Sequence, residues 1–167
     1  KLTARNLVIK LDIPIKRAIT IIGPRRAGKT YFFYQLIDEL QAKKIVKARI
    51  LYINFENPIF AEAEAVDLGK IIDVFFEIYP ANKKRKIYLF FDEIQNIEGW
   101  EIFIRHLIDS QNCQIFLTGS SSKLLSSEIA TSLRGRTINH LMLPFSFSEL
   151  LSLKSVEYKK YLSSEID

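Results

Sequence analysis

Short apolar runs and amphipathic stretches alternate along most of the chain. Five apolar runs, rich in β-branched and aromatic residues, predict buried strands at about 18–23, 49–55, 86–92, 113–118 and 137–143. Apolar residues at helical spacing predict helices near 29–42, 67–79 and 99–109, with a short one near 123–128. This alternation predicts an α/β fold with one parallel, doubly wound sheet and right-handed crossovers.

Two predicted helices carry a continuous apolar stripe, which we expect to pack on the sheet rather than to bind a cofactor. In the helix near 67–79 the stripe consists of Leu68, Ile71, Ile72, Phe75 and Tyr79. In the helix near 99–109 it consists of Trp100, Phe103, Ile104, Leu107 and Ile108. The acid-rich stretch from Glu56 to Asp67 is expected to be a surface loop.

Length and composition predict one soluble domain with a substantial core. The chain has 167 residues, of which 48% are hydrophobic. No apolar run is long enough to cross a membrane, and no secretory pattern opens the sequence, so we expect a cytoplasmic location and no membrane partner. The single cysteine, Cys113, excludes an internal disulfide, and with only two histidines the sequence predicts no zinc site.

The turn after the first predicted strand has a complete G-x-x-x-x-G-K-T pattern. Its residues are Gly23, Pro24, Arg25, Arg26, Ala27, Gly28, Lys29 and Thr30, and we assign nucleotide binding to these eight and to Tyr31. A strand, a glycine loop and a helix together direct backbone N–H groups at one anion. The glycines allow close approach of phosphate, Lys29 is expected to reach the β- and γ-phosphates, and Thr30 is expected to bind Mg²⁺. The alternative is an ordinary glycine turn.

The third apolar run ends in two acids, Asp92 and Glu93. A buried parallel strand would deliver both at its carboxyl end, where open α/β sheets bind ligands. Asp92 is expected to hold Mg²⁺, directly or through water, and Glu93 to act as general base on the attacking water. The alternative is a turn-capping aspartate followed by a solvated glutamate. Glu56, at the end of the second strand, is a candidate for a secondary role.

The last two strands add candidates that could act on the γ-phosphate. Ser120 is the first choice for sensing it and Thr118 the second, with a helix cap as the alternative role of Ser120. Arg136 and, after it, Arg134 are candidates to stabilise the charge of phosphoryl transfer, in their own subunit or across an interface. The alternative is a surface arginine paired with an acid.

Several segments together resemble the predicted AAA-type ATPases common in archaea and bacteria. The segments are Gly23 to Thr30, Tyr52 to Pro58, Asp92 to Trp100, Thr118 to Ser121, Leu133 to Arg136 and Leu143 to Leu150. The double arginine of the loop and the Asp-Glu-Ile-Gln segment with its following Gly-Trp are the specific parts. The resemblance covers residues 15–152, or nearly the whole chain.

This resemblance implies an ATPase domain that uses ATP and Mg²⁺. It implies a P-loop NTPase three-layer sandwich whose five parallel strands follow the AAA-type order 5-1-4-3-2. ATP rather than GTP is expected because no Asn-Lys-x-Asp motif follows. Residues 1–152 would form the ATPase domain, and 153–167 would begin a linker to a C-terminal domain absent from this chain. ATP turnover would be coupled to that domain or to a neighbouring subunit of a homo-oligomer, since several AAA relatives form rings whereas others work as monomers or dimers.

Other functions stay open at this point. One alternative is a nucleotide-dependent regulatory switch with slow turnover, and another is a small-molecule kinase with Arg134 and Arg136 in a lid. A DNA-associated binding module is a further alternative, because the net charge is +5 and basic residues form two clusters. The clusters are Lys43, Lys44, Lys47 and Arg49, and then Lys83, Lys84, Arg85 and Lys86. We expect both at the sheet edge opposite the nucleotide, where solvated loops are the simpler explanation.

Overall fold

The computed structural model describes residues 4–120 and 133–153. Its strands are β1 (Ala18–Gly23), β2 (Ile50–Asn54), β3 (Ile87–Asp92), β4 (Cys113–Ser120) and β5 (Thr137–Leu141). Its helices are α1 (Lys29–Ala42), α2 (Ala65–Ile78), α3 (Trp100–Ser110) and α5 (Phe147–Leu153). Short 3₁₀ turns cover Lys47–Arg49, Pro58–Phe60, Pro80–Lys84 and Ile94–Asn96. None of the described helices is both long and apolar enough to cross a membrane.

The five strands form one sheet in the order β2-β3-β4-β1-β5, and every neighbouring pair is parallel. This is the predicted order 5-1-4-3-2 counted from the other edge, so the predicted fold class is confirmed. Parallel pairing requires crossovers, and α1, α2 and α3 lie in the connections from β1 to β2, β2 to β3 and β3 to β4. It also places the carboxyl ends of all strands at one edge of the sheet.

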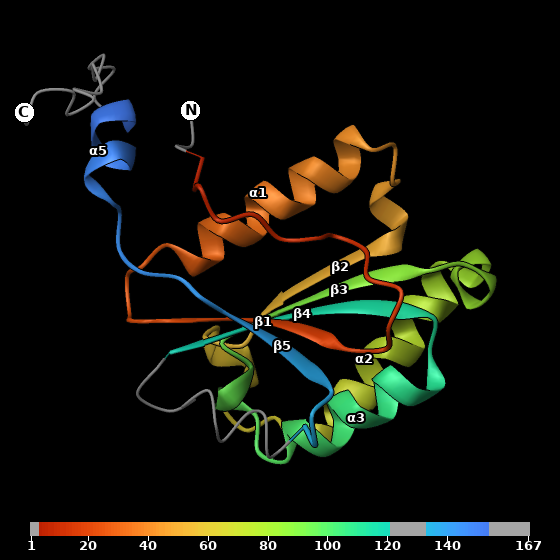
Figure 1. Cartoon of the computed structure of the whole chain (residues 1–167). Coiled ribbons are helices and arrows are strands. Elements are labelled where there is room, and N and C mark those ends of the chain that lie inside the picture. The colour runs from red at the N-terminus through yellow and green to blue at the C-terminus, as the bar shows by residue number, and fades with distance from the viewer. Residues whose placement is uncertain (1–3, 121–132, 154–167) are drawn as a thin grey trace, which may run out of the picture.

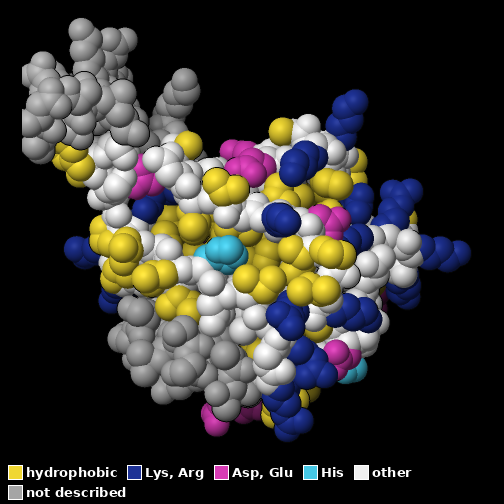
Figure 2. Space-filling model, in the orientation of Figure 1, with side chains coloured by type: hydrophobic (Ala, Val, Ile, Leu, Met, Phe, Trp, Pro, Cys, Tyr) yellow, Lys and Arg dark blue, Asp and Glu magenta, His cyan; other side chains and the backbone are white. Residues whose placement is uncertain are grey.

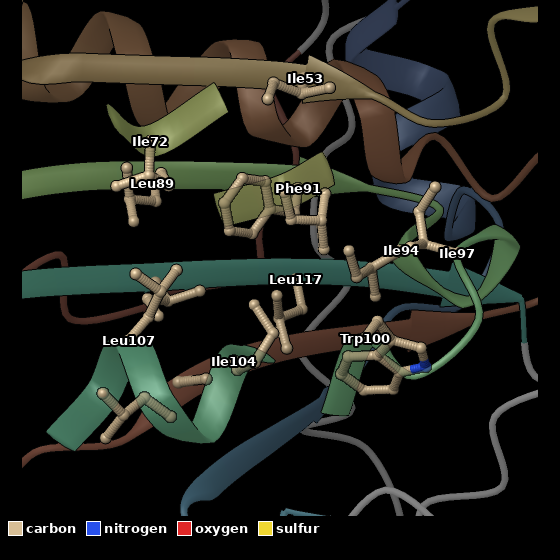
Figure 3. Close-up of a cluster of buried hydrophobic side chains, with 14 of the residues drawn as sticks. Ile53, Ile72, Leu89, Phe91, Ile94, Ile97, Trp100, Ile104, Leu107 and Leu117 are labelled. Carbon is tan, nitrogen blue, oxygen red and sulfur yellow. The ribbon is translucent and has the colours of Figure 1, made fainter. Parts of the chain in front are cut away.

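Helices cover both faces of the sheet (Figure 1). Side chains alternate between the faces, so that Leu89 and Phe91 of β3 pack with α2 and α3, whereas Phe90 packs with α1. On the α1 face, the Phe90 and Phe116 rings stack at 4.5 Å between centroids. On the other face, Trp100 and its neighbours fill the space between α3 and the sheet (Figure 3). The result is the three-layer arrangement that the sequence predicts.

The expected helix stripes are correct except at one end. Leu68, Ile72 and Phe75 are buried as predicted, but Tyr79 is 41% exposed and Phe76 is buried instead. The reason is that α2 ends at Ile78, just before Pro80, so Tyr79 leaves the helical phase. The helix also begins at Ala65, with a capping box between Glu64 and Asp67, so the expected loop from Glu56 to Asp67 is shorter than predicted.

Two segments outside the predicted elements are ordered parts of the fold. The N-terminal segment before β1 buries Ile9, Leu11 and Ile13 in the α1-side core. The chain after β5 forms α5, a helix that the apolar pattern does not predict. The expected short helix near 123–128 lies outside the described residues. Strand β5 is at the sheet edge, and hydrophobic side chains gather on the surface around it (Figure 2).

Candidate functional site

The glycine loop connects β1 to α1 at the carboxyl edge of the sheet. Gly28 has φ 90° and Arg26 has φ 65°, so the loop turns twice through the left-handed region. A Cβ on Gly23 would lie 2.0 Å from the Met142 carbonyl oxygen, in the chain that follows β5. Position 23 therefore accepts only glycine, because the backbone after β5 passes directly over it.

Lys29 lies folded across this loop. Its Nζ donates hydrogen bonds to the Gly23 and Pro24 carbonyl oxygens, both at 3.1 Å. The same Nζ lies 3.5 Å from Glu93 Oε1, and the lysine side chain is only 4% exposed. The ammonium thus stands beside the loop backbone with a carboxylate as its counterion.

Asp92, at the end of β3, is fully buried. Both of its carboxylate oxygens accept hydroxyl hydrogen bonds: Thr118 donates to Oδ1, and Tyr52 donates to Oδ2 at 3.1 Å. Burial, the hydrogen bond with Tyr34 and the Asp92 charge all raise the pKa of Tyr52 well above its ordinary value. Tyr52 therefore stays a neutral donor, and Asp92 forms no ion pair within the described part of the chain.

Glu93 has φ 53°, a left-handed conformation that is uncommon for a non-glycine residue. Its N–H donates to Thr118 Oγ1 at 2.9 Å, so one buried hydroxyl joins both acids. Its Oε2 accepts a hydrogen bond from Gln95 Nε2 at 2.5 Å. Residues held in such backbone conformations concentrate at functional sites, because surrounding contacts must hold them there.

The sequence-predicted residues of the first, third and fourth strands therefore meet at one edge. Thr118, the second choice, contacts both acids. Ser120, the first choice, ends β4 and pairs in register with Gly23, which places it beside the start of the loop. Thr30 and Tyr31 open α1 next to Lys29, and Tyr31 is 60% exposed with its ring against Tyr34.

The structure does not bring Arg134 and Arg136 to the loop of their own chain. The Arg136 carbonyl accepts a hydrogen bond from the N–H of Ala18, the first residue of β1, and its Nε lies 3.2 Å from Asp109 Oδ1. From Ala18, β1 extends for six residues, or about 20 Å, to the start of the glycine loop. Arg136 therefore lies far from the loop of its own subunit, because a residue that precedes a parallel strand lies at the amino edge of the sheet. A role across an interface stays a prediction.

Three of the remaining charged residues, Arg25, Arg49 and Lys86, have structural partners. Arg25, at the tip of the loop, forms an exposed ion pair of 3.1 Å with Glu56. In the basic clusters, Arg49 donates to the Lys86 carbonyl oxygen and lies over the Tyr88 ring, while the Lys86 ammonium pairs with Asp12. Arg49 of the first cluster and Lys86 of the second therefore have structural roles. A nucleic-acid surface stays a prediction.

Sequence reasoning missed a group of residues that reach the loop from the chain's ends. Arg5 donates to the Ala27 carbonyl oxygen of the loop, to the Leu143 carbonyl oxygen at 2.6 Å and to Glu149 Oε1 at 2.9 Å. Its guanidinium lies 4.6 Å from the centroid of the Phe145 ring. No local signal marks these residues, since 144 positions separate Arg5 from Glu149.

Tyr52 and Gln95 were also missed. Tyr52 lies inside an apolar strand, where a tyrosine is ordinary core packing until the β2–β3 register places it near Asp92. Gln95 follows Glu93 by two positions and lies in the Asp-Glu-Ile-Gln segment, and these were the signals available. Together the site offers a backbone cradle, one ammonium and two carboxylates, which is chemistry suited to a polyphosphate with its metal ion. Among the described residues, no group of three or more His, Cys, Asp or Glu side chains could hold a metal ion by itself.

Comparison with known proteins agrees with this geometry. A family model described as an AAA domain matches residues 15–151. An uncharacterized protein of Methanocaldococcus jannaschii is 43% identical over 164 residues, which are 98% of this chain and 34% of that protein. An uncharacterized protein of Haemophilus influenzae is 38% identical over 147 residues, 87% of this chain and 36% of that protein. The chain thus spans about a third of the length of these relatives.

A likeness to a solved structure concerns the fold. The structure of C. elegans PCH-2 superimposes with a TM-score of 0.52 at 17% sequence identity. The superposition covers 86% of this chain and 40% of that one. The shared architecture is the sandwich of parallel sheet and helices described above.

Proposed function

The chain belongs to the AAA domain family and is a nucleotide-binding domain of that type, and from this premise we propose that it binds ATP with Mg²⁺ and hydrolyses it to ADP and phosphate. The observation that carries the proposal is the convergence of Lys29, Asp92 and Glu93 at the carboxyl edge of the sheet. The contacts that each of these three side chains makes in the structure are consistent with the role proposed for it.

Lys29 would bind the β- and γ-phosphates once it leaves Glu93. Its present partners are two loop carbonyls and that carboxylate, and they keep the buried ammonium neutralised until phosphate oxygens replace them. The backbone of Gly23 to Thr30, together with Tyr31, would surround the phosphates. The exposed Arg25 and Arg26 lie at the outer side of the loop.

Asp92 and Thr30 fit a Mg²⁺ ion that arrives with the nucleotide. A fully buried carboxylate with only hydroxyl donors around it has an uncompensated charge, which a divalent cation would balance. Such an ion would neutralise charge on the β- and γ-phosphates. Thr118 and Tyr52 hold the Asp92 carboxylate oriented for it.

Glu93 would act as general base. The oxygen of a water molecule bonds to the γ-phosphorus, the bond from that phosphorus to the bridging oxygen breaks, and ADP leaves with the electron pair. The water's proton passes to the Glu93 carboxylate. Ser120, beside the start of the loop, would sense the γ-phosphate.

We also propose that hydrolysis depends on a second copy. Arg134 and Arg136 lie at the edge away from their own loop, so they would stabilise the transition state only in a neighbouring subunit. Leu141, the last residue of the edge strand β5, and Leu143, just beyond it, are both exposed. Their exposure supports association through the β5 edge of the sheet. In the full protein, residues 1–152 would then couple nucleotide state through α5 and residues 153–167 to a C-terminal region or a partner.

The test compares Glu93→Gln, Lys29→Ala and wild type for ATP binding and for turnover across protein concentrations. Glu93→Gln is expected to keep ATP binding and to lose turnover by about 100-fold or more, whereas Lys29→Ala loses binding. Glu77→Gln, an identical change at an exposed position of α2, is the matched control and should match wild type.

Turnover that rises steeply with protein concentration would support an arginine supplied by a second copy. Wild-type protein that binds ATP tightly and shows no turnover at any concentration would refute hydrolysis and favour a nucleotide-dependent switch.

A further inference from the structure

Gln95 lies in a rigid turn directly beside the proposed general base. The turn Ile94–Asn96 follows Glu93, and its flanking side chains Ile94 and Ile97 are buried in the core between β3, β4 and α3 (Figure 3). The N–H of Asn96 donates to the Glu93 carbonyl oxygen at 3.1 Å, and its side chain donates to the Phe55 carbonyl oxygen. The Gln95 backbone is therefore held in place from both sides.

The Gln95 amide makes one strong contact and leaves one group without a partner. Nε2 donates to Glu93 Oε2 at 2.5 Å, while Oε1 is buried and has no hydrogen-bond partner among the described residues. If the amide were flipped, its oxygen would face the negatively charged Glu93 carboxylate and be repelled by it. The amide NH₂ group is therefore the one that contacts Glu93. An orphan buried oxygen lowers the stability of the fold, a penalty that an apolar side chain of the same shape would avoid. Stability alone does not explain a glutamine here.

The two Glu93 oxygens have different partners. Oε1 faces the Lys29 ammonium at 3.5 Å, and Oε2 accepts the Gln95 amide hydrogen bond. If Lys29 turns to the phosphates, Oε1 loses its partner and Gln95 remains the side chain that holds the carboxylate. The backbone of Glu93 meanwhile stays bonded to Thr118.

We propose that Gln95 is a positioning residue that keeps the Glu93 carboxylate in place after Lys29 moves to ATP, and that Oε1 is the atom that takes the proton from water. The inference rests on the proposed ATP hydrolysis. Oε2 stays occupied by the amide, so the oxygen that Lys29 vacates is the free base. Because the Gln95–Glu93 bond exists before and during ATP binding, its loss should slow the chemical step and leave ATP affinity unchanged.

The test uses the full chain with Gln95→Met, which keeps the side chain's length and removes both polar atoms. We expect ATP to bind within about twofold of wild type and kcat to fall by about 10- to 100-fold, since small misplacement of a catalytic group has effects of that size. The thermal midpoint should stay close to that of wild type, because loss of the hydrogen bond to the Glu93 carboxylate is offset by removal of the orphan oxygen. Gln95→Asn, which keeps the amide on a shorter stem, should show a smaller fall.

A double-mutant cycle with Glu93→Gln, followed by single-turnover product formation, separates positioning from structure. Gln95→Met should have less than about a twofold effect when position 93 is no longer a base. Unchanged kcat in Gln95→Met would overturn the inference. An equal fall in the Glu93→Gln background, or a large loss of ATP affinity, would do the same.

Failure of both Gln95 variants to fold would assign this side chain a structural role and also overturn the inference. Wild-type turnover that Lys29→Ala abolishes is the reference for all of these comparisons. If that reference turnover is absent, the proposed hydrolysis fails and the positioning role fails with it. If it is present and Gln95→Met matches wild type, only the role of Gln95 fails.

Discussion

At the scale of single residues, the Thr118 hydroxyl connects the two acids of the site. It donates to Asp92 Oδ1 and accepts the Glu93 N–H, which uses its single donor and one acceptor position. Thr118 is fully buried in β4, so neither partner finds water if the hydroxyl is removed. The hydroxyl therefore orients the Asp92 carboxylate and the Glu93 backbone at the end of β3.

Thr118→Val should therefore be costly although the side chain keeps its shape. The substitution leaves the Glu93 N–H and one Asp92 oxygen without partners, and each such group costs about 1–3 kcal/mol. We expect a lower midpoint in urea unfolding and slower ATP turnover. Thr118→Ser is the control, because it loses only a methyl group and keeps the hydroxyl. Equal losses in the valine and serine variants would show that the hydroxyl bridge contributes nothing.

At the scale of elements, the loop is shaped by the close approach of β1 and the chain leaving β5. The Met142 N–H donates to the Ile22 carbonyl oxygen at 2.7 Å, and the Met142 carbonyl oxygen lies where a Cβ of Gly23 would be. The first glycine of the motif thus serves strand packing as well as phosphate binding. By contrast, Gly69 lies inside α2 with open space around it.

The same substitution at these two glycines should have opposite effects. Gly23→Ala forces backbone against backbone and should lower the free energy of unfolding by about 1–3 kcal/mol or more. Gly69→Ala should raise it by about 0.5–1 kcal/mol, because alanine is the better helix former. Urea titration of both variants measures the difference. A Gly23→Ala protein as stable as wild type would contradict the close approach.

At the scale of the whole molecule, the two ends of the described chain are joined over the loop. Arg5 and Glu149 form an ion pair whose side chains are only 8% and 7% exposed, and Arg5 also holds the loop carbonyl of Ala27. The Glu149 carboxylate accepts further hydrogen bonds from the backbone of Asn6 and Ser146. A change in the loop would thereby reach α5, which supports the proposed coupling of nucleotide state to the chain that follows.

This junction should make the fold sensitive to acid. Burial by itself raises the pKa of Glu149, but the hydrogen bonds from Asn6, Ser146 and Arg5 together outweigh it and lower the pKa from 4.5 to about 2. A carboxyl group whose pKa is lower in the folded state adds stability above its unfolded pKa and loses it as the pH falls toward the folded value. The contribution of Glu149 is therefore complete above pH 4.5 and declines between 4.5 and about 2.

Glu149→Gln should remove this pH dependence. At neutral pH the variant should lose about 2 kcal/mol, the scale of hydrogen bonds to a charged group. Between pH 4.5 and 2 the gap to wild type should narrow, because wild type then loses the same contribution. Denaturant unfolding at a series of pH values measures both effects. A gap that stays constant through this range would mean that the Glu149 charge does not stabilise the fold.

The features that the sequence by itself determined are those encoded in neighbouring residues. The glycine loop is eight consecutive residues, Asp92 and Glu93 are adjacent at a strand end, and the apolar periods specify strands and helices locally. From these the layer architecture follows, and the AAA-type strand order came from the resemblance of the same segments to a family. Chain positions alone could also have placed Arg136 at the amino edge, since it precedes a parallel strand.

Only the tertiary structure decided which distant residues complete the site. Strand register brings Tyr52 and Thr118 to Asp92, across 40 and 26 positions of sequence, and chain crossing brings Arg5 to the loop and to Glu149. The side-chain contact of Gln95 with Glu93 depends on a left-handed backbone that no local pattern predicts. Periodicity reports which face of an element is buried, whereas a hydrogen bond needs two atoms within about 3 Å, and that precision exists only once the elements have packed.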